Sequence, residues 1–543
     1  MPSVDRTTLA TGRQRTVLRL VCDGVERFYA DDALHFTDST PGSTGAVVTV
    51  AGMAEPDIAD QLGAEGDALA VELLDPASHA DLIAGLDGAW AEVSQIVEGQ
   101  DWTARRVLLR GYTDAPIYGT ADEPIRFGLA SAPWEDRGLL PLPTWQTGPE
   151  TWPRATSGLV CPEELHGLFY PVVIGDPGSD RDTVTEADWF PLPALIVEID
   201  DSIDPPDNSA AACVVLLGAG VLACVGASVE VYNETATAGG TAVSCVVSPF
   251  VTSDLMGQVV TCVEIAAADM PVVIGDALWW RSEVIGNPVG ITRTSRAGEA
   301  IRWMLSFSSA EVDADLLRDA ADRLDRWRVG FFLNEPVSPY RYIQDHFFPV
   351  LPVLPIDGPA GFGLAVLPTQ PADADGLEEI DVDAAGGARS GPVERSSWRE
   401  VSTSLAMEYA QDIRLGAYRR RIDLDPTITR PVGSRQPTPY GAAMALRYPG
   451  LRLLSLDSEI VCDALTATAL AEYQIRRASQ ISAELEVTLP QSYQYLQSGD
   501  LVRLTVADIG WSAVLCVALS VPRISGMGVF RFRTVPDWTR AQA

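Results

Sequence analysis

Lysine is absent from the 543-residue chain, so all 39 basic side chains are arginine. Arginine keeps its charge and forms forked hydrogen bonds to carboxylates, which suits permanent interfaces. GC-rich codon usage also replaces lysine with arginine, and we favour this simpler explanation. The 74 acidic residues give a formal net charge of −35. A field of this sign repels nucleic acid and anionic lipid, so we expect no stable binding to either, although DNA can pass without adhering.

Histidine and cysteine are also scarce. The four histidines are isolated and form no HExxH motif, and the eight cysteines form no CxxC pair. No apolar signal core opens the N-terminus, so we expect free, buried thiols. The chain has no GxSxG elbow or P-loop, and its carboxylates are too abundant for one glycosidase pair to stand out. We therefore predict no catalytic, cofactor-binding or metal-binding residues, and a protein that is not an enzyme.

One uncharged run, residues 210–229, has the length of a membrane-spanning helix. Aspartates precede it and Glu230 and Glu234 follow it, without the arginine asymmetry of a membrane span. The run continues into an alternating Val-Glu-Val-Tyr segment, which is typical of a strand. We therefore predict a buried strand pair and no membrane span.

The same run contains a GxGxxA pattern at Gly218, Gly220 and Ala223. In a dinucleotide-binding turn these glycines let the backbone approach a pyrophosphate, but a long helix must follow the turn. Here Gly226 and the alternating segment follow instead. We interpret the pattern as a glycine-bearing β-hairpin, without a nucleotide cofactor.

The length of the chain predicts two to four domains. Apolar runs separated by turn residues predict strands through most of residues 1–280, with residues 79–99 left open between helix and strand. Helices are expected after residue 290, one capped by Ser295 and a second that begins near Asp313, where the acidic side chains of Asp313 and Asp315 favour the helix start. The acidic segment 371–400 is interpreted as a linker or exposed loop.

The last part of the chain returns to strands. A helix is expected near 463–477, and strict alternation from Ile481 to Leu489 predicts a strand of a closing antiparallel sheet or barrel. The fold class is therefore mainly β with a smaller helical section (α+β), in several barrel or sandwich domains. The four expected domains are a β-rich domain at 1–170, a β-rich insertion at 171–290, an α+β domain with an acidic linker at 291–400, and a β domain with one helix at 401–543.

The stretch from Arg323 to Leu364 links these halves. Ser338 and Pro339 predict a helix start, and Pro349 predicts its end. Prolines at 349, 352 and 355 then predict a stiff extended segment that is not a central strand. We interpret this stretch as a rigid elbow. Its candidate packing and assembly residues are Tyr340, Ile343, Phe347, Trp327 and Pro349.

Two stretches resemble a known family. Residues 115–178 contain the patterns P-x-YG…EP-x-x-F and YP-x-x-x-G-x-PG, separated by a Pro/Trp-rich connector. The elbow carries N-E-P-V-S-P at 334–339 and P-V-L-P at 352–355. Together with the closing helix and strands, these resemble the tail-tip or baseplate-hub proteins of long-tailed (siphovirus-like) phages and gene transfer agents. The block at 180–290 matches nothing in that family.

This resemblance implies a homotrimeric ring of β domains that caps the tail tube, with the first 170 residues as the N-terminal hub domain. The expected partners are the distal tail or tail tube protein, the tape-measure protein, and tail fibre or spike proteins. The expected location is the virion tail tip, after assembly in the host cytoplasm, with roles in host attachment and DNA ejection. The acidic charge fits a lumen that DNA traverses.

Two other classes stay open. Tail-associated cell-wall-degrading or carbohydrate-binding components are one, because the tryptophan pairs Trp279-Trp280 and Trp145/Trp152 suit either sugar stacking or core packing. A bacterial surface adhesin is the other, and the missing secretion signal argues against it.

Overall fold

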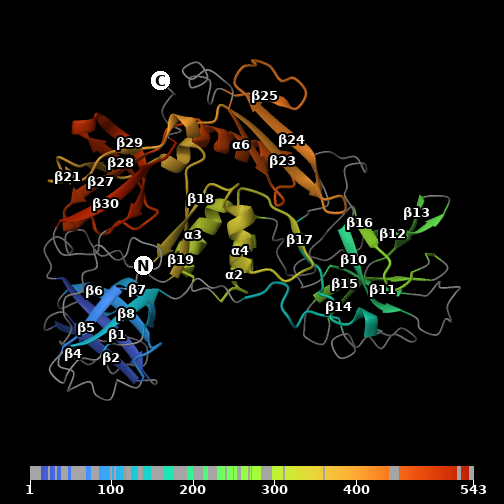
Figure 1. Ribbon diagram of the computed structural model, residues 1–543, viewed down its shortest axis with the longest axis horizontal. Coiled ribbons are helices and arrows are strands. Elements are labelled where there is room, and N and C mark those ends of the chain that lie inside the picture. The colour runs from blue at the N-terminus through green and yellow to red at the C-terminus, as the bar shows by residue number, and fades with distance from the viewer. Residues whose placement is uncertain are drawn as a thin grey trace.

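The computed structural model shows a mainly β protein with a smaller helical part, as the sequence predicts (Figure 1). Several sheets surround a central group of helices, drawn in yellow in Figure 1. The described residues are 14–22, 25–30, 34–37, 47–50, 69–74, 85–97, 101–102, 105–114, 117, 124–131, 138–147, 161, 163–175, 192–199, 212–217, 229–238, 241–248, 250–253, 259–266, 269–270, 272–282, 296–309, 312–358, 361–438, 452–521 and 527–536.

The N-terminal part forms a six-stranded sheet in the order β2-β1-β6-β7-β8-β5, with a separate β3-β4 hairpin. Strand β6 covers residues 90–97 of the ambiguous segment 79–99, and the described residues 85–89 before it contain turns and no strand. Glu92 of β6 is fully buried, and its carboxylate accepts hydrogen bonds from Arg105 Nε at 2.6 Å and Arg110 Nε at 2.8 Å. The strands are β1 (Gln14–Cys22), β2 (Val25–Ala30), β3 (Leu34–Thr37), β4 (Val47–Val50), β5 (Leu69–Leu73), β6 (Trp90–Val97), β7 (Arg106–Thr113) and β8 (Ile125–Ser131).

The second part forms a seven-stranded sheet in the order β13-β12-β16-β10-β11-β15-β14. Strand β10 joins its two halves, because its first residues pair with β16 and its later ones with β11. The sheet folds back so that β13 also lies close to β15. Its strands are β10 (Leu192–Ile199), β11 (Ala212–Leu217), β12 (Val229–Ala238), β13 (Thr241–Val247), β14 (Phe250–Ser253), β15 (Val259–Ile265) and β16 (Leu278–Ser282).

The expected hairpin at 210–229 is wrong in its pairing. Strands β11 and β12 do form at its two ends, but β16 and β10 lie between them in the sheet. Each strand pairs with partners from elsewhere because tertiary pairing, not chain proximity, decides the neighbours. Gly218, Gly220 and Ala223 lie outside the described residues. Within the described part of the chain, no helix is long and apolar enough to cross a membrane.

The central helices are α2 (Ala297–Leu305) and α3 (Ala314–Leu324). They pack closely at Gly298, where a Cβ atom would lie 2.1 Å from the Ala321 carbonyl oxygen. Helix α3 begins next to Asp313 as predicted, and the Asp313 side chain caps it by accepting from two backbone N–H groups of the first turn. The cap position of α2 is Arg296 rather than Ser295, and its side chain makes no cap hydrogen bond. The backbone N–H of Glu299 instead donates to Asp325 Oδ1 at 3.0 Å. The residue that follows α3 therefore provides a hydrogen-bond acceptor for the first turn of α2.

The predicted elbow helix is present and begins as expected. Ser338 Oγ accepts from the Arg341 backbone N–H at 3.2 Å, and Pro339 occupies the first position of α4 (Pro339–Tyr342). The helix continues as a π-helix, η5 (Ile343–Phe347), with Phe348 N–H donating to Ile343 O at 3.2 Å. A π turn rotates the following side chains relative to an α-helix. Tyr342, the last residue of α4 before this turn, is also buried on the core side, which the α-helical spacing does not predict.

The structure places the five elbow candidates as follows. Ile343 and Phe347 are fully buried and Trp327 is 3% exposed. Tyr340 is half-buried, with its ring 5.2 Å from that of Phe362, and Pro349 is exposed. Their proposed part in assembly stays a prediction.

Two short pairings hold the elbow. Strand β17 (Phe331–Leu333) pairs with β9 (Val172–Ile174), and β18 (Val353–Gly358) forms a two-stranded hairpin with β19 (Gly361–Val366). The proline-rich segment is therefore not a central strand, as predicted. The hexapeptide PVVIGD occurs in the sequence at 171–176 and again at 271–276. Its first copy contributes Val172–Ile174 to β9, whereas the second copy contains a turn in which Asp276 Oδ2 accepts from Val273 N–H at 2.8 Å.

The C-terminal part has a seven-stranded and a four-stranded sheet. In the first, the order is β20-β28-β29-β30-β27-β21, and β22 also pairs with β27. The second has the order β25-β24-β23-β26 and packs against α6 (Ala464–Ala478). The strands are β20 (Glu379–Asp381), β21 (Ala388–Arg389), β22 (Glu394–Arg395), β23 (Ser404–Asp412), β24 (Ala417–Asp425), β25 (Arg435–Pro437), β26 (Leu453–Asp457), β27 (Ala483–Leu489), β28 (Leu501–Val506), β29 (Trp511–Ser520) and β30 (Gly528–Thr534).

The C-terminal part of the structure tests two predictions made from the sequence. Strand β27 alternates between buried and more exposed side chains, as its sequence predicts. The acidic segment 371–400 contributes β20, β21 and β22 to the closing sheet, so it is more than the linker that its composition suggests. These strands have two or three residues, which is too few for a visible alternation. The expected domain boundaries remain predictions.

The burial of Ile343 gives a first prediction. We expect Ile343→Asp to lower the free energy of unfolding by roughly 3–5 kcal/mol, because it buries an unpaired carboxylate. Gln344→Asp, at the exposed neighbouring position, is the matched control and should change stability little. Urea denaturation of both variants measures the difference. Equal stability of the two would show that the elbow helix is not packed as described.

A second prediction concerns Asp425. Burial by itself raises the pKa of Asp425, but hydrogen bonds from Arg435 and Thr427 outweigh this effect and lower the pKa to about 2. A lowered folded pKa adds stability above the ordinary value near 3.8, which is lost as pH falls toward 2. We expect Asp425→Asn to cost about 1–2 kcal/mol at pH 7. The difference from the original protein should shrink below pH 4 in pH-dependent denaturation; a constant difference would contradict the cause.

Candidate functional site at the junction pocket

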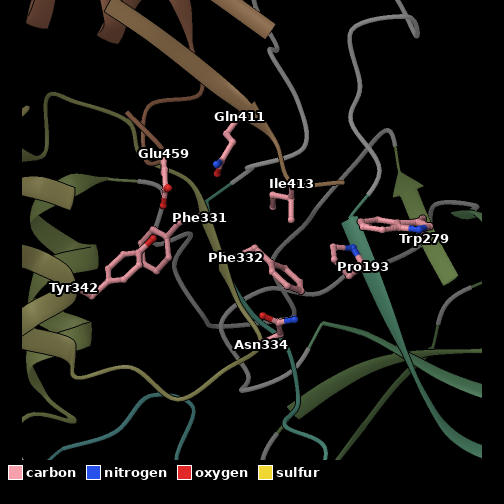
Figure 2. Close-up of a pocket in the computed structure, with 9 residues that line it drawn as sticks. All are labelled: Pro193, Trp279, Phe331, Phe332, Asn334, Tyr342, Gln411, Ile413 and Glu459. Atoms are coloured by element: carbon pink, nitrogen blue, oxygen red, sulfur yellow. The ribbon is translucent and has the colours of Figure 1, made fainter. Parts of the chain in front are cut away.

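A pocket of about 290 Å³ lies where three parts of the fold meet (Figure 2). Its walls come from strands β10 and β16 of the seven-stranded sheet, from the elbow, and from the four-stranded sheet with the segment that follows β26. We call it the junction pocket. Its lining residues are Pro193, Trp279, Phe331, Phe332, Asn334, Tyr342, Gln411, Ile413 and Glu459.

Strand β17 forms one wall. Its pairing with β9 fixes the strand, and successive side chains then point to opposite faces. Phe331 is 2% exposed and packs against Tyr342 and Phe347, with ring centroids 5.1 and 5.9 Å away. Phe332 is half-buried and lies near the centre of the pocket in Figure 2. The strand therefore connects the core of the elbow with the pocket surface.

A tyrosine, a histidine and a glutamate stand together at one end. His346 Nδ1 lies 3.3 Å from Glu459 Oε2, and the His346 ring is centred 4.3 Å from that of Tyr342. Burial raises the pKa of the Tyr342 hydroxyl above its ordinary value, and the charge of Glu459 adds to the effect. Tyr342 is therefore a neutral wall residue. His346 is half-buried, and its imidazole lies between the Tyr342 ring and the Glu459 carboxylate.

The turn after β23 forms a third wall with Gln411 and Ile413. Asp412, between them, is fully buried and accepts from the backbone N–H groups of Arg414 at 3.1 Å and Leu415 at 3.4 Å. Its other oxygen accepts from Arg419 Nε at 2.9 Å. These bonds fix the turn that presents Ile413.

An ion pair closes the junction beside this turn. Arg414 Nη1 lies 2.8 Å from Glu234 Oε1 of β12, so the four-stranded sheet is joined to the seven-stranded sheet. Both side chains are about one-third exposed, so the pair contributes at most about 1 kcal/mol. It aligns the two walls more than it stabilises them.

The remaining wall comes from strands β16 and β10, and only one of the two adjacent tryptophans of β16 faces the pocket. Trp279 and Pro193 are opposite one another in the β16–β10 pair and both line the pocket. Trp280 points to the other face of the strand and is fully buried. Of the other pair, Trp145 is buried against Phe307, with ring centroids 5.5 Å apart, and Trp152 lies outside the described residues. Core packing thus accounts for Trp145 and Trp280, while Trp279 is available to a ligand.

The sequence did not indicate this site. None of the five predicted elbow residues lines the pocket, although Phe347 supports Phe331 from behind. The lining residues come from separate segments with no shared motif. Strand alternation in Phe331-Phe332 and Trp279-Trp280 is the one signal that separates core from surface side chains.

Metal chemistry finds no support in the described parts of the chain, where no cluster of three or more His, Cys, Asp or Glu side chains could hold an ion. Cys22, Cys245, Cys262, Cys462 and Cys516 are buried, and Cys161 is half-buried.

Comparison with known proteins gives distant similarities. No family model and no curated protein matches the chain. A chain from the virion of a native gene transfer agent (GTA) particle matches with a TM-score of 0.40 and 11% identity, over 73% of this chain and 89% of that one. The 43 kDa tail protein of prophage MuSo2 from Shewanella oneidensis matches with a TM-score of 0.24 and 10% identity, over 70% and 99%. Both TM-scores lie below 0.5, so these likenesses assign no function to this chain.

A third prediction tests the pocket turn. Asp412→Ala should lower the free energy of unfolding by about 1–3 kcal/mol, because it removes the buried carboxylate that accepts from the Arg414 backbone N–H and from the Arg419 guanidinium. Asp412→Asn keeps a side-chain oxygen and should recover part of the loss. Chemical denaturation of the two variants measures this order. Equal stability of Asp412→Ala and the original protein would contradict the role of Asp412.

Proposed function

We propose that the protein is a structural component of a phage-like tail, placed at the tail tip as the baseplate hub. The observation that carries the proposal is that the described parts of the two family-like stretches bond to each other. Leu140 and Val337 exchange backbone hydrogen bonds of 2.9 and 3.0 Å. Strand β9, from the first stretch, pairs with β17, immediately before the N-E-P-V-S-P sequence. Sequence patterns that resemble one family thus belong to one structural unit.

The architecture supports an assembly role. Several sheets surround the central helices in Figure 1, and their outer strands, such as β13 and β26, have a partner on one side only among the described residues. Unpaired strand edges are able to pair with another chain. Val246 of β13 and Leu453 of β26 are 68% and 60% exposed, which gives these edges apolar contacts to offer.

The charge also supports this role. In the described part, arginines form local ion pairs with carboxylates, such as Arg421 with Glu408 and Asp423. The excess of acidic residues leaves a strongly negative chain. A ring of such chains would have a lumen that repels DNA and lets it slide.

In this proposal the protein forms a homotrimer that caps the tail tube. Its partners are the distal tail or tail tube protein, the tape-measure protein, and fibre or spike proteins. It is assembled in the host cytoplasm, contributes to host attachment and DNA ejection, and has no enzymatic activity.

A cell-wall-degrading or carbohydrate-binding tail component is the second candidate. The observation that favours it is the aromatic lining of the junction pocket, with the amides of Asn334 and Gln411 beside it. Glycoside hydrolysis generally needs two carboxyl groups about 5–10 Å apart. Glu459 is the single carboxylate among the described lining residues, which argues against a hydrolase at this site.

The fourth prediction separates these candidates. Particles purified from cells that produce an epitope-tagged chain should contain the tag, and immunogold should mark one end of the tail. Ile343→Asp should remove the chain from particles, whereas Gln344→Asp should not.

Two results would contradict the proposal. One is a tag that is absent from intact particles, or present away from the tail end. The other is clearing of host peptidoglycan in a zymogram by the purified protein, which would overturn the non-enzymatic part in favour of the second candidate.

A further inference from the structure

We propose that the junction pocket binds an arginine side chain presented by a partner protein. That this partner is a tail protein rests on the proposed function. The argument that the pocket recognises arginine does not depend on that function. Three features of the pocket carry the inference, namely its charge, its aromatic rings and its neutral acceptors.

The charge favours a cation. Glu459 is the only charged side chain among the described lining residues, and its carboxyl group is 39% exposed. His346 contacts Oε2, while Oε1 accepts no hydrogen bond from a described residue. The field of a chain with net charge −35 further concentrates cations at such an opening. A neutral ligand would leave the negative charge of the Glu459 carboxylate without a cationic partner from the ligand.

The rings favour a flat cation. Phe331 and Tyr342 lie below Glu459 in Figure 2, but they are 2% and 9% exposed and pack against each other, so the half-buried rings of Phe332 and Trp279 are the ones that a ligand can reach. Phe332 and Trp279 extend the aromatic surface toward the opposite end. Cations bind over aromatic faces within about 6 Å, and guanidinium also stacks on them.

The amides favour guanidinium over ammonium. Gln411 and Asn334 lie on two further sides of the pocket in Figure 2, and each has a carbonyl oxygen that accepts hydrogen bonds. A guanidinium group has five N–H donors in one plane, so it can donate to Glu459 and to an amide together. A lysine ammonium is a compact point charge without this span.

The size limits the ligand to one side chain. The volume of about 290 Å³ is at the small end of ligand pockets, which run from about 300 to 1,000 Å³. An arginine with its methylene stem fills such a space, and Ile413 and Pro193 provide apolar contacts for the stem.

The test uses the full-length protein and small neutral and charged probes. Nα-acetyl-arginine methylamide should bind in calorimetric or ligand-observed NMR titrations. The citrulline analogue, which has the same shape without the charge, should bind about tenfold more weakly, as loss of a charged hydrogen bond predicts. The lysine analogue should fall between them.

Two variants locate the effect. Glu459→Gln should weaken arginine binding about tenfold and bring the arginine-to-citrulline ratio close to one. Glu408→Gln removes a carboxylate of nearly equal exposure, 38%, that does not line the pocket, and should leave binding within about twofold. Circular dichroism confirms that both variants are folded.

Three results would overturn the inference. These are equal binding of the arginine and citrulline probes, no binding of the arginine probe, or unchanged arginine binding by Glu459→Gln. Binding of N-acetylglucosamine without arginine would assign the pocket to saccharides instead. None of them affects the tagged-particle result, so a failure here is distinguishable from a failure of the proposed function.

Discussion

The pairing of β9 with β17 is the constraint on which the central part of the structure depends. It joins Val172–Ile174 to Phe331–Leu333, which are more than 150 residues apart in the sequence, and this is a large loop to close. Once closed, it fixes Phe331 in the core beside Tyr342 and Phe347, and places Phe332 in the pocket. Gly175, directly after β9, permits the approach, because a Cβ there would lie 2.0 Å from the Val329 carbonyl oxygen. In the sequence, strands β10 to β16 lie between β9 and β17, so the chain forms that whole sheet between the two paired strands.

The strong negative charge sets the second condition. Buried carboxylates are tolerated where arginines or backbone N–H groups satisfy them, as at Glu92 and Asp412. At the junction pocket, by contrast, the carboxylate of Glu459 contacts His346 through one oxygen only. That difference connects the two proposals, since a protein that assembles with others through its edges also offers one acidic, aromatic site to a basic side chain.

Local features were predictable from the sequence because neighbouring residues determine them. The cap at Ser338, the helix start near Asp313 and the alternation of β27 follow from short-range interactions and strand period. Features that depend on distant segments were not. The partners of β11 and β12, the π turn at Ile343 and the strands within 371–400 are set by tertiary packing. The pocket could not be predicted from the sequence for the same reason. Its walls come from segments up to hundreds of residues apart in the sequence, and Glu459 approaches Tyr342 only in the folded chain.

The central claim is that this chain is a ring-forming structural part of a tail tip. A cryo-electron microscopy reconstruction of the particles tests it most directly, because it locates every ordered chain in the tail. The account predicts three copies around the tail axis at its tip, with the β9–β17 pairing and the elbow intact in each. A tail tip reconstructed at side-chain resolution, in which no density fits this chain, would contradict it.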